Sequence, residues 1–448
     1  MKNKALIRKT VIIGIPIIIQ NIVTSSLHLV DNLMLSHLSE NAFASAALAN
    51  QVSFLLILSV FGLGTGSGVL IAQFYGKKDE KNIRKTISIG VAFAFIIGLL
   101  FTVLSVFFPE VILKIFSKDS DVITKGTSYL RISAICFIPI AITYIFTAAS
   151  RSIGNSKISM YSSIIAVVLN VILNWLLIFG NMGFPKLGIV GAAIATVISR
   201  FFELIFILVI IKKLKLSILV KVRDFFDVSK QLLKRYISIS LPVVTNEFMW
   251  ALGHVIFVFA VSRLGTSFVS AYNAVGIVVN VIINLGFGMS LALATVIGNL
   301  IGEGRQREAK EISVQFFVYS TVATIFISLG IVFLADTIAG IFEFSVATYE
   351  LMKKMLYIMS VMIIFYNFNT IYVVGISRGG GDTKATMYIE ILTIWLIGVP
   401  LSLLGSYMGV SPIWLYLIIS FEEFIKAFIC LYRFKSDKWI NNVVSDIV

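Results

Sequence analysis

Carboxyl and carboxamide side chains inside long apolar stretches are the residues of this sequence that could do chemistry. Asp31 lies in one such stretch, within HLVDNLMLS, and Asn170 and Asn174 lie one helical turn apart in another, LNVILNW. Polar groups in apolar surroundings are costly, so each of them needs a reason to be there. A carboxylate among amides can hold a proton or exchange it for a cation, which predicts an ion-coupling site. Two structural explanations stay open: Asp31 could be solvated at a helix end, and the amides could only join helices.

A second set of polar residues lies in the other half of the chain. Glu247 follows Pro242 in LPVVTNEFMW, and Asn367 lies in a later apolar stretch. Glu247 could take and release protons, or it could be an interfacial residue at the start of its helix. Pro16 precedes Asp31 in the same predicted helix and removes one of its hydrogen bonds, so we expect a bend or hinge at Pro16.

Four other ionisable residues are interpreted as structural ion pairs. Arg200 and Glu203 are three positions apart, and both lie on one face of a helix. Glu422 and Lys426 are four positions apart, which places them on one helix face as well. We assign no role to three further ionisable residues: Glu390, Arg131 and His254.

The composition places all of these residues in a membrane protein. Of the 448 residues, 58% are hydrophobic and 13% are charged, which is about half of the charged share of a soluble domain. Apolar segments of about 20 residues or more predict transmembrane helices. Twelve are expected: 10–36, 43–75, 86–108, 121–150, 158–179, 188–211, 236–262, 268–301, 311–334, 345–376, 385–405 and 411–432. The predicted fold class is an all-α integral membrane protein with twelve transmembrane helices.

Most of the 37 lysines and arginines fall on one side of these segments, with eight of them between Lys212 and Arg235. The positive-inside rule then places both termini and this region on the cytoplasmic side of the cell inner (plasma) membrane. This topology accounts for the net charge of +14 without a nucleic-acid partner. Membrane lipids are expected partners of the basic connector. The first apolar run is too long for a signal peptide, so we expect it to be the first span.

The chain also contains its own pattern twice. Pro16 aligns with Pro242, and the run RSIGNSK at 151–157 aligns with RGGGDTK at 378–384. The duplication predicts two pseudo-symmetric lobes of six helices, which begin on the same side of the membrane and are joined by a cytoplasmic connector. Transporters bind their cargo between such repeats, so the duplication points to transport. The predicted parts are an N-lobe at 1–212, the connector at 213–235 and a C-lobe at 236–448.

The residues needed for catalysis or nucleotide binding are missing from the sequence. The run GLGTGSG at 62–68 lacks the Lys-Ser/Thr pair of a phosphate loop and lies in an apolar helix. We find no nucleophile–base pair, and the three histidines and two cysteines have no metal-ligand spacing. We therefore expect no enzyme and no cofactor. The energy for transport is then expected from a gradient of H⁺ or Na⁺.

Over the full length and in this order, the motifs resemble the multidrug and toxic compound extrusion (MATE) family. In the first half they are Pro16 before VDNLMLSHL, GLGTGSGVLIAQFYGKKD, RSIGNSK, NVILNWLLIFG and PKLGIVGAAIAT. In the second half they are LPVVTNE, RLGTSFVSAYNA, IGNLIGEGR and RGGGDTK. The resemblance implies the fold of the MOP superfamily, with two six-helix lobes around a central cavity. It also implies multidrug efflux by cation or proton antiport, with access alternating between the two sides.

The resemblance also implies roles for individual residues. The family's helix-1 aspartate falls on Asp31, and its helix-5 polar pair falls on Asn170 and Asn174. The helix-7 glutamate of the NorM-like branch falls on Glu247, and the helix-10 aspartate of that branch falls on Asn367. A second ion site at Glu247 and Asn367 would therefore be incomplete, and we favour the DinF-like branch with Asp31 as the principal coupling residue. No metal is expected beyond a possible Na⁺ at these sites.

Small-molecule cationic or amphipathic drugs are the expected substrates. Adaptable apolar walls with a few acids favour bulky lipophilic cations, through contact area, charge and cation–π contacts. A plain packing role for such side chains stays open. From helix position, the substrate cavity is predicted to include Gln20, Met249, Trp250, Phe257, Met289 and Tyr366, with Phe54 and Phe61 as further candidates.

Two other functions explain the sequence less well. A flippase for lipid-linked oligosaccharides or lipids, from the same superfamily, would need cationic cavity residues to hold pyrophosphate, whereas the residues expected here are acids and amides. A channel or receptor would not explain paired lobes with polar residues inside the spans. Because one chain contains the whole expected path, a monomer is sufficient for transport.

Overall fold

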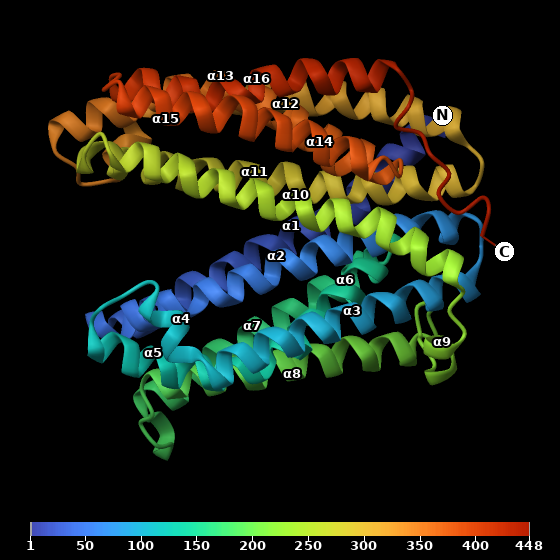
Figure 1. Ribbon diagram of the computed structural model, residues 1–448. Helices are drawn as coiled ribbons and strands as arrows, with labels where there is room; N and C mark the ends of the chain where they lie inside the picture. The colour runs from blue at the N-terminus through green and yellow to red at the C-terminus, as the bar shows by residue number, and fades with distance from the viewer. Residues whose placement is uncertain (1, 448) are drawn as a thin grey trace. The chain divides into compact units, whose positions relative to one another are not determined.

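The structure, a computed structural model, describes residues 2–447, except for the side chains of residues 2, 3, 28 and 29. All regular elements of the described residues are helices, which confirms the predicted all-α class (Figure 1). The packing of the helices divides these residues into two units. We call residues 15–244 with residue 447 the N-unit, and residues 2–14 with residues 245–446 the C-unit.

The N-unit begins inside α1 (Lys2–Ser36) and continues into the first part of α10 (Lys230–Ser262). Both of these helices contain an internal proline, Pro16 in α1 and Pro242 in α10. The elements between them are α2 (Glu40–Gly76), α3 (Glu80–Phe107), α4 (Pro109–Lys114), α5 (Ser120–Ser133), η1 (Ala134–Cys136), α6 (Phe137–Ser152), α7 (Ser156–Phe179), η2 (Asn181–Gly183), α8 (Ile189–Lys213) and α9 (Val222–Phe226).

The C-unit contains the start of α1, the rest of α10 and all the later helices. Two short π-helical segments, η3 and η4, interrupt this series, and such segments are frequent at functional sites. The elements are α11 (Thr266–Gly302), α12 (Gln306–Gly340), α13 (Val346–Thr370), η3 (Ile371–Ser377), α14 (Thr383–Thr393), η4 (Ile394–Gly398), α15 (Val399–Tyr407) and α16 (Pro412–Lys435).

Eleven helical segments of the described residues are long and apolar enough to cross a membrane. Some of them combine neighbouring elements, as α5, η1 and α6 do over Ser120–Ser152. The twelfth predicted span, residues 411–432, corresponds to α16, which is a helix of 24 residues. Its central residues Glu422, Glu423 and Lys426 are charged, so α16 differs in composition from the other eleven segments.

Local sequence signals explain where several helices begin and end. The side chains of Ser39 and Asp79 accept hydrogen bonds from backbone N–H groups in the first turns of α2 and α3, which satisfies donors that a helix start leaves free. Helix α7 ends at Gly180, whose φ of +76° lies in the left-handed region that favours glycine. These signals set the boundaries of the helices that carry the polar residues described below.

In the N-unit, α2 packs on α3, α5 and α6, and α7 packs mainly on α8 (Figure 1). Glycines allow helix backbones to approach closely. At Gly66 of α2, an added Cβ would lie 2.5 Å from the Cα atom of Ser240 in α10. This contact leaves no room for a side chain, so Gly66 sets the distance between α2 and the first part of α10.

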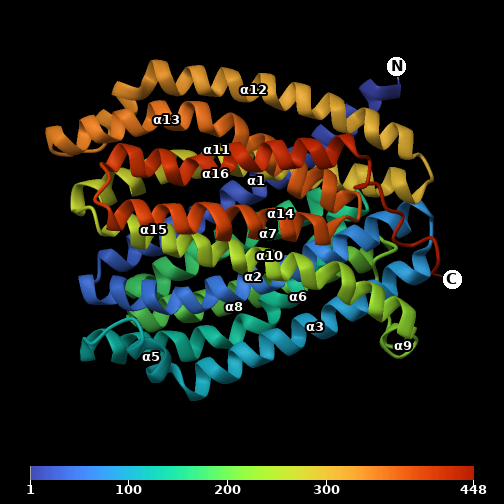
Figure 2. The ribbon, with the colours of Figure 1, turned by 45° about the horizontal axis from the view of Figure 1, so that its top comes forward.

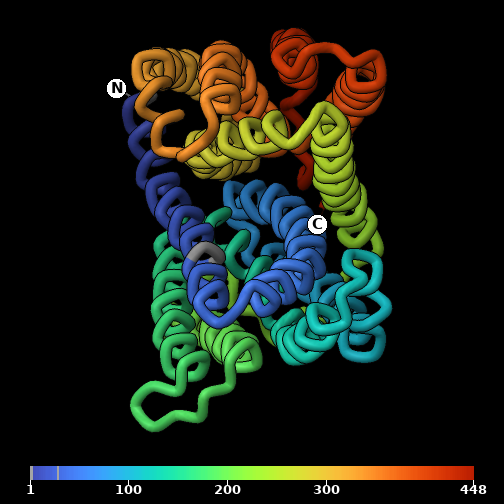
Figure 3. Tube along the Cα trace, turned by 90° about the vertical axis from the view of Figure 1, so that its left-hand side faces the viewer, coloured from blue at the N-terminus to red at the C-terminus, as the bar shows by residue number. Residues whose placement is uncertain are grey.

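In the C-unit, α13 is the central helix. It packs on α11, α12 and α16, and α12 lies beside it along most of its length (Figure 2). In the end-on view, most helices of each unit are seen along their axes as coiled tubes (Figure 3). A cluster of buried apolar side chains from α10 to α16 forms the core of this unit, with Met352, Met355 and Leu356 of α13 fully buried.

The connector at 213–235 is bound to the beginning of α3 within the N-unit. Lys85 Nζ lies 3.0 Å from Asp227 Oδ2, and Arg84 Nε lies 3.6 Å from Asp224 Oδ2. The hydrogen bond from Lys85 lowers the pKa of Asp227 below its usual value, because it stabilises the ionised carboxylate. The whole connector therefore belongs to one packing unit, and the division of the chain into repeats at 213–235 stays a prediction.

The close approach at Gly66 predicts a selective loss of stability. We expect Gly66→Ala to destabilise the protein by about 1–3 kcal/mol, because an extra methyl group in a tight contact forces the backbones apart. The measurement is the midpoint of thermal unfolding of the purified protein in detergent. Gly330→Ala in α12 is the matched control, because its Cβ would meet nothing within 4 Å and its midpoint should not fall. Equal losses in both variants would contradict this explanation.

Candidate functional site

The structure brings together the three residues predicted to form the ion-coupling site. Asn174 Nδ2 donates hydrogen bonds to Asp31 Oδ1 at 2.5 Å and to Asn170 Oδ1 at 2.9 Å. The Asn170 amide in turn donates to Thr196 Oγ1 at 3.4 Å. Both asparagines are buried, whereas Asp31 is partly exposed. We call these four residues, Asp31, Asn170, Asn174 and Thr196, the carboxyl–amide cluster; it lies entirely within the N-unit.

Helix geometry explains how the carboxyl–amide cluster forms. Asn170 and Asn174 are one turn apart on α7, so they lie on the same face. Helix α8 packs on this helix and contributes Thr196, a residue that the sequence reading did not select. The amide oxygen Asn174 Oδ1 is buried and has no hydrogen-bond partner among the described residues. A neutral Asp31 could donate a proton to such an acceptor, while an ionised Asp31 accepts from the amide nitrogen.

A second polar network lies in the same unit. Gln20 Nε2 donates to Ser163 Oγ at 3.1 Å, and Ser163 Oγ donates to Glu203 Oε1 at 2.8 Å. Arg200 Nη1 lies 2.8 Å from Glu203 Oε2, which confirms the predicted ion pair. Gln20, for which a place in the substrate cavity stays a prediction, links α1 to this ion pair through Ser163. Ser163 was missed, because a serine among other serines at the start of an apolar helix has no distinctive signal.

Pro16 lies inside α1, which the structure describes as one helix from Lys2 to Ser36. The boundary between the two packing units falls next to it, between Gly14 and Ile15. An added Cβ on Gly14 would lie 2.5 Å from Met289 Sδ, so Met289 packs against the start of α1. The role of Pro16 as a hinge stays a prediction.

In the C-unit, Glu247 does not pair with Asn367. Glu247 Oε1 lies 2.8 Å from Arg378 Nη1, and the Arg378 side chain is only 2% exposed. Asn367 Nδ2 donates to Thr324 Oγ1 of α12 at 2.7 Å. The neighbouring amide of Asn246 donates to Glu390 Oε2 at 2.6 Å, which gives Glu390 the partner that the sequence did not reveal. The described contacts therefore give Glu247 and Asn367 separate partners.

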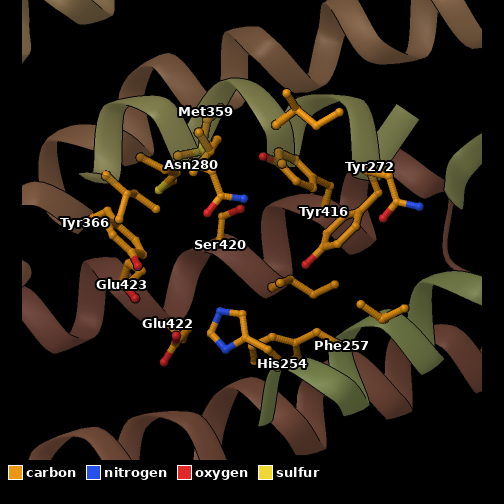
Figure 4. Close-up of a pocket in the computed structure, with 18 of the residues that line it drawn as sticks. His254, Phe257, Tyr272, Asn280, Met359, Tyr366, Tyr416, Ser420, Glu422 and Glu423 are labelled. Atoms are coloured by element: carbon orange, nitrogen blue, oxygen red, sulfur yellow. The ribbon is translucent and has the colours of Figure 1, made fainter. Parts of the chain in front are cut away.

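A cavity of about 530 Å³ opens between α10, α11, α13 and α16 of the C-unit. Its walls are mostly aromatic, aliphatic and methionine side chains, and its polar groups include two carboxyl groups (Figure 4). We call it the C-unit pocket. Its lining includes Trp250, His254, Phe257, Tyr272, Asn280, Met359, Met362, Tyr366, Tyr416, Ser420, Glu422 and Glu423.

The C-unit pocket contains half of the predicted cavity residues. Trp250, Phe257 and Tyr366 line it, as their positions on α10 and α13 allow. Three others are not part of its lining: Gln20, Met249 and Met289. The Met249 carbonyl accepts a hydrogen bond from Trp395 Nε1 at 3.2 Å. The weaker candidates Phe54 and Phe61 belong to α2 of the N-unit.

The sequence reading interpreted Glu422 as the partner of Lys426 and did not select Glu423. Lys426 Nζ lies 3.5 Å from Glu422 Oε1, so the expected pair is present, but it lies closer to Glu423 Oε1, at 2.8 Å. Three charged residues within one apolar helix were the available signal for a site. His254, which had no assigned role, lines the pocket, and its Nδ1 lies 3.0 Å from the Trp250 carbonyl. Because a carbonyl can only accept, Nδ1 carries the proton of this bond.

Comparison with known proteins assigns the chain to a group of transporters. A family model described as MatE matches residues 16–176 and 242–404. The probable multidrug resistance protein YoeA of Bacillus subtilis is 27% identical over 400 residues, which cover 88% of this chain and 85% of that protein. The probable multidrug resistance protein NorM of Thermotoga maritima is 24% identical over 453 residues, with coverage of 98% and 94%.

Solved structures share the fold of this chain. A MATE structure in the bent conformation superposes with a TM-score of 0.87 at 19% identity and covers 98% of both chains. The straight conformation gives a TM-score of 0.86 at 19% identity and covers 97% of both chains. A MOP superfamily transporter from Pyrococcus furiosus gives 0.84 at 18% identity and 96% coverage of both chains. The predicted two-lobed MOP-superfamily fold is thereby confirmed.

The pairing of Glu247 with Arg378 predicts how single and double substitutions differ. Arg378→Gln would leave Glu247 without a counter-charge among buried groups, so we expect a loss of about 3–5 kcal/mol. The midpoint of thermal unfolding in detergent measures this loss. In the double variant Arg378→Gln/Glu247→Gln no charge remains unpaired, and most of the lost stability should return. A double variant no more stable than the single one would contradict the pairing.

Proposed function

Because the chain belongs to the MatE family, the multidrug and toxic compound extrusion transporters, we propose that it exports lipophilic, mostly cationic compounds by antiport with H⁺ or Na⁺. The chain is a multi-pass membrane protein of a transporter family. Its relatives YoeA and NorM are described as probable multidrug resistance proteins, which supports drugs as substrates. We further propose a monomer in the plasma membrane with both termini in the cytoplasm.

The single observation that carries this proposal is the contact between Asp31 and Asn174. It holds the carboxyl group of α1 against a buried amide of α7 within the N-unit. An ionised Asp31 accepts the hydrogen bond, whereas a bound proton or Na⁺ neutralises the carboxylate and changes the partners that it can use. The contact between α1 and α7 therefore depends on whether the ion is bound. This dependence is what an ion-coupled conformational change requires.

The proposed cycle alternates between two forms of α1. On the outer side, Asp31 takes the ion, α1 bends near Pro16 and the drug leaves. On the inner side, the ion leaves, the contact with Asn174 forms again and the drug rebinds. The similarity to MATE structures in both a bent and a straight conformation supports a fold that accommodates two forms. In this chain, Pro16 lies in the same helix as Asp31, so a bend near Pro16 would occur in the helix that carries the coupling residue.

Charge balance favours one coupling ion per cycle at Asp31. The ion pair between Glu247 and Arg378 already neutralises Glu247, so we do not place a second ion there. Exchange of one proton for one monovalent cation is electroneutral and gains nothing from a membrane potential, which would supply about 2.3 kcal/mol per charge per 100 mV. Transport of this kind has to be driven by the concentration gradient of the ion itself. A pH gradient or a Na⁺ gradient must therefore be sufficient.

A flippase for lipid-linked oligosaccharides is the alternative within the same superfamily. Recognition of a pyrophosphate would require exposed cationic side chains in the binding cavity. The lining of the C-unit pocket instead includes Glu422 and Glu423, and Lys426 beside them pairs with both. Acidic walls repel a pyrophosphate and attract organic cations, so drug efflux is the function that this pocket supports better.

Ethidium transport into inverted membrane vesicles tests the proposal. With a pH gradient and a Na⁺ gradient imposed separately, we expect one of them to drive transport in the wild type. Asp31→Asn should reduce this transport to the background of vesicles without the protein. The asparagine keeps an oxygen that can accept from Asn174 but cannot change its charge.

Asp336→Asn is the matched control, because Asp336 is an exposed aspartate that pairs with Lys353 outside the proposed machinery, and transport should be unchanged. Undiminished transport in Asp31→Asn would place the coupling elsewhere. Absence of wild-type transport under either gradient would contradict antiport and favour the flippase.

A further inference from the structure

The C-unit pocket contains two adjacent glutamates of α16, and their surroundings differ. Glu422 is 2% exposed and Glu423 is 9% exposed, so both carboxyl groups are largely removed from water. Both line the pocket, on the side where His254 and Tyr366 also lie (Figure 4). A buried carboxylate has to be satisfied by hydrogen bonds and counter-charges inside the protein. The partners of the two residues therefore show which of them is satisfied.

Glu423 has a partner for each of its oxygens. Oε1 accepts from Lys426 Nζ at 2.8 Å, and Oε2 accepts from Asn369 Nδ2 at 2.7 Å. The Asn369 amide also donates to the Glu423 backbone carbonyl, so α13 holds this residue at two points. Lys426 itself is 2% exposed, and its ammonium group is thus kept in the pair. Glu423 is a satisfied, structural carboxylate.

Glu422 is not satisfied in this way. Its Oε1 has only the long contact of 3.5 Å with Lys426, which is already engaged by Glu423. Its Oε2 is buried and has no hydrogen-bond partner among the described residues. Leaving a buried acceptor unpaired costs more than the net gain of an ordinary hydrogen bond. A ligand that supplies a donor at this wall of the pocket would remove that cost.

The charged residues around the pocket determine whether a cationic or an anionic ligand can bind there. Glu422 interacts electrostatically with Glu390, Glu423 and Lys426. Glu390 interacts in turn with Glu247, whose partner is Arg378. Together, these interacting residues carry four carboxyl groups and two cationic side chains: Glu247, Glu390, Glu422, Glu423, Arg378 and Lys426. With all six ionised, their net charge is negative even when His254 is counted as positively charged. An anionic ligand is excluded by this balance, and one positive charge brings the group closer to neutrality.

The rest of the pocket is suited to a bulky apolar body. A volume of about 530 Å³ lies within the range of drug-sized sites. The aromatic rings of Trp250, Tyr272 and Tyr416 provide flat apolar surfaces, and Tyr272 and Tyr416 meet edge to face with their ring centroids 6.0 Å apart. Met359 and Met362 add flexible side chains that can adapt to different shapes. Such walls bind by contact area, so they do not by themselves distinguish one cation from another.

We propose that Glu422 is the acceptor for the N–H group of a protonated lipophilic amine in the C-unit pocket, and that Glu423 with Lys426 and Asn369 positions it. This inference rests on the proposed export of organic cations and adds a specificity-determining residue to it. A protonated secondary or tertiary amine offers both a charge and an N–H donor. A quaternary ammonium offers the charge alone, so the site prefers the amine.

Equilibrium binding of radiolabelled imipramine, a tertiary amine, to the purified full-length chain in detergent tests the proposal. Two competitors isolate the two features of the amine. N-methylimipramine keeps the positive charge but has no N–H group, and N-propyliminodibenzyl keeps the tricyclic body with neither a basic amine nor an N–H group. Because the assay uses no ion gradient, its result is independent of transport. Loss of efflux with intact imipramine binding would count against the proposed function and not against this site.

We expect Glu422→Gln to weaken imipramine binding by at least about tenfold, the effect of losing one charge-assisted hydrogen bond. Binding of N-propyliminodibenzyl should change by less than about twofold, because no charge is involved. Asp336→Asn is the control, because Asp336 is an exposed acid of α12 that does not line the pocket, and imipramine affinity should change by less than about twofold. In the wild type, N-methylimipramine should bind more weakly than imipramine, and Glu422→Gln should abolish this difference.

Three results would overturn the proposal. One is equal imipramine affinity in the wild type and in Glu422→Gln. Another is an equal loss of imipramine affinity in Asp336→Asn. The third is equal wild-type affinity for imipramine and N-propyliminodibenzyl, which would show an apolar pocket suited to a lipid chain. If Glu422→Gln does not elute as a folded protein in gel filtration, the wild-type comparison of the three compounds still decides, since it needs no variant.

Discussion

A carboxyl group among membrane helices has to find its hydrogen bonds and its counter-charge inside the protein, and this constraint organises the structure. Water is not available there to satisfy it, so each acid is either neutralised by a cation or left responsive to an added ion. Glu247 and Glu203 have arginine partners, and Glu423 has a lysine and an amide. Among the described residues, Asp31 accepts a hydrogen bond from the neutral amide of Asn174, and one oxygen of Glu422 has no hydrogen-bond partner.

This difference separates structural acids from functional ones. An arginine-paired carboxylate has a fixed charge balance, and protonating it would break the pair. A carboxylate that depends on amides can gain or lose a cation at lower cost, because its neighbours do not change charge. Two of the acids that the structure leaves responsive lie in different units, Asp31 in the N-unit and Glu422 in the C-unit. The proposals accordingly give them different tasks, ion coupling for Asp31 and recognition of the organic cation for Glu422.

The helices and part of the candidate site could be predicted from the sequence, because these features depend on residues that are close together in the chain. Long apolar segments and the spacing of Asn170 and Asn174 are local properties, so the all-α class and the face that these amides share could be read directly. The partner of Glu247 could not be read, because Arg378 is distant in sequence and joins it only through packing. Met289 has the residue type of a cavity wall but packs on Gly14, which its type does not reveal. Glu422 and Lys426 have the spacing of a simple i,i+4 pair, but Lys426 lies closer to Glu423, which the spacing does not show.

Infrared difference spectroscopy of the purified protein between high and low pH, with and without Na⁺, would show whether Asp31 binds the coupling ion. We expect a carboxyl C=O band that appears when the coupling ion is a bound proton, or a carboxylate band that shifts when it is Na⁺. In either case the signal must vanish in Asp31→Asn and remain in Asp336→Asn. A difference spectrum that is the same in Asp31→Asn and in the wild type would show that Asp31 keeps its charge, and the proposed coupling would be wrong.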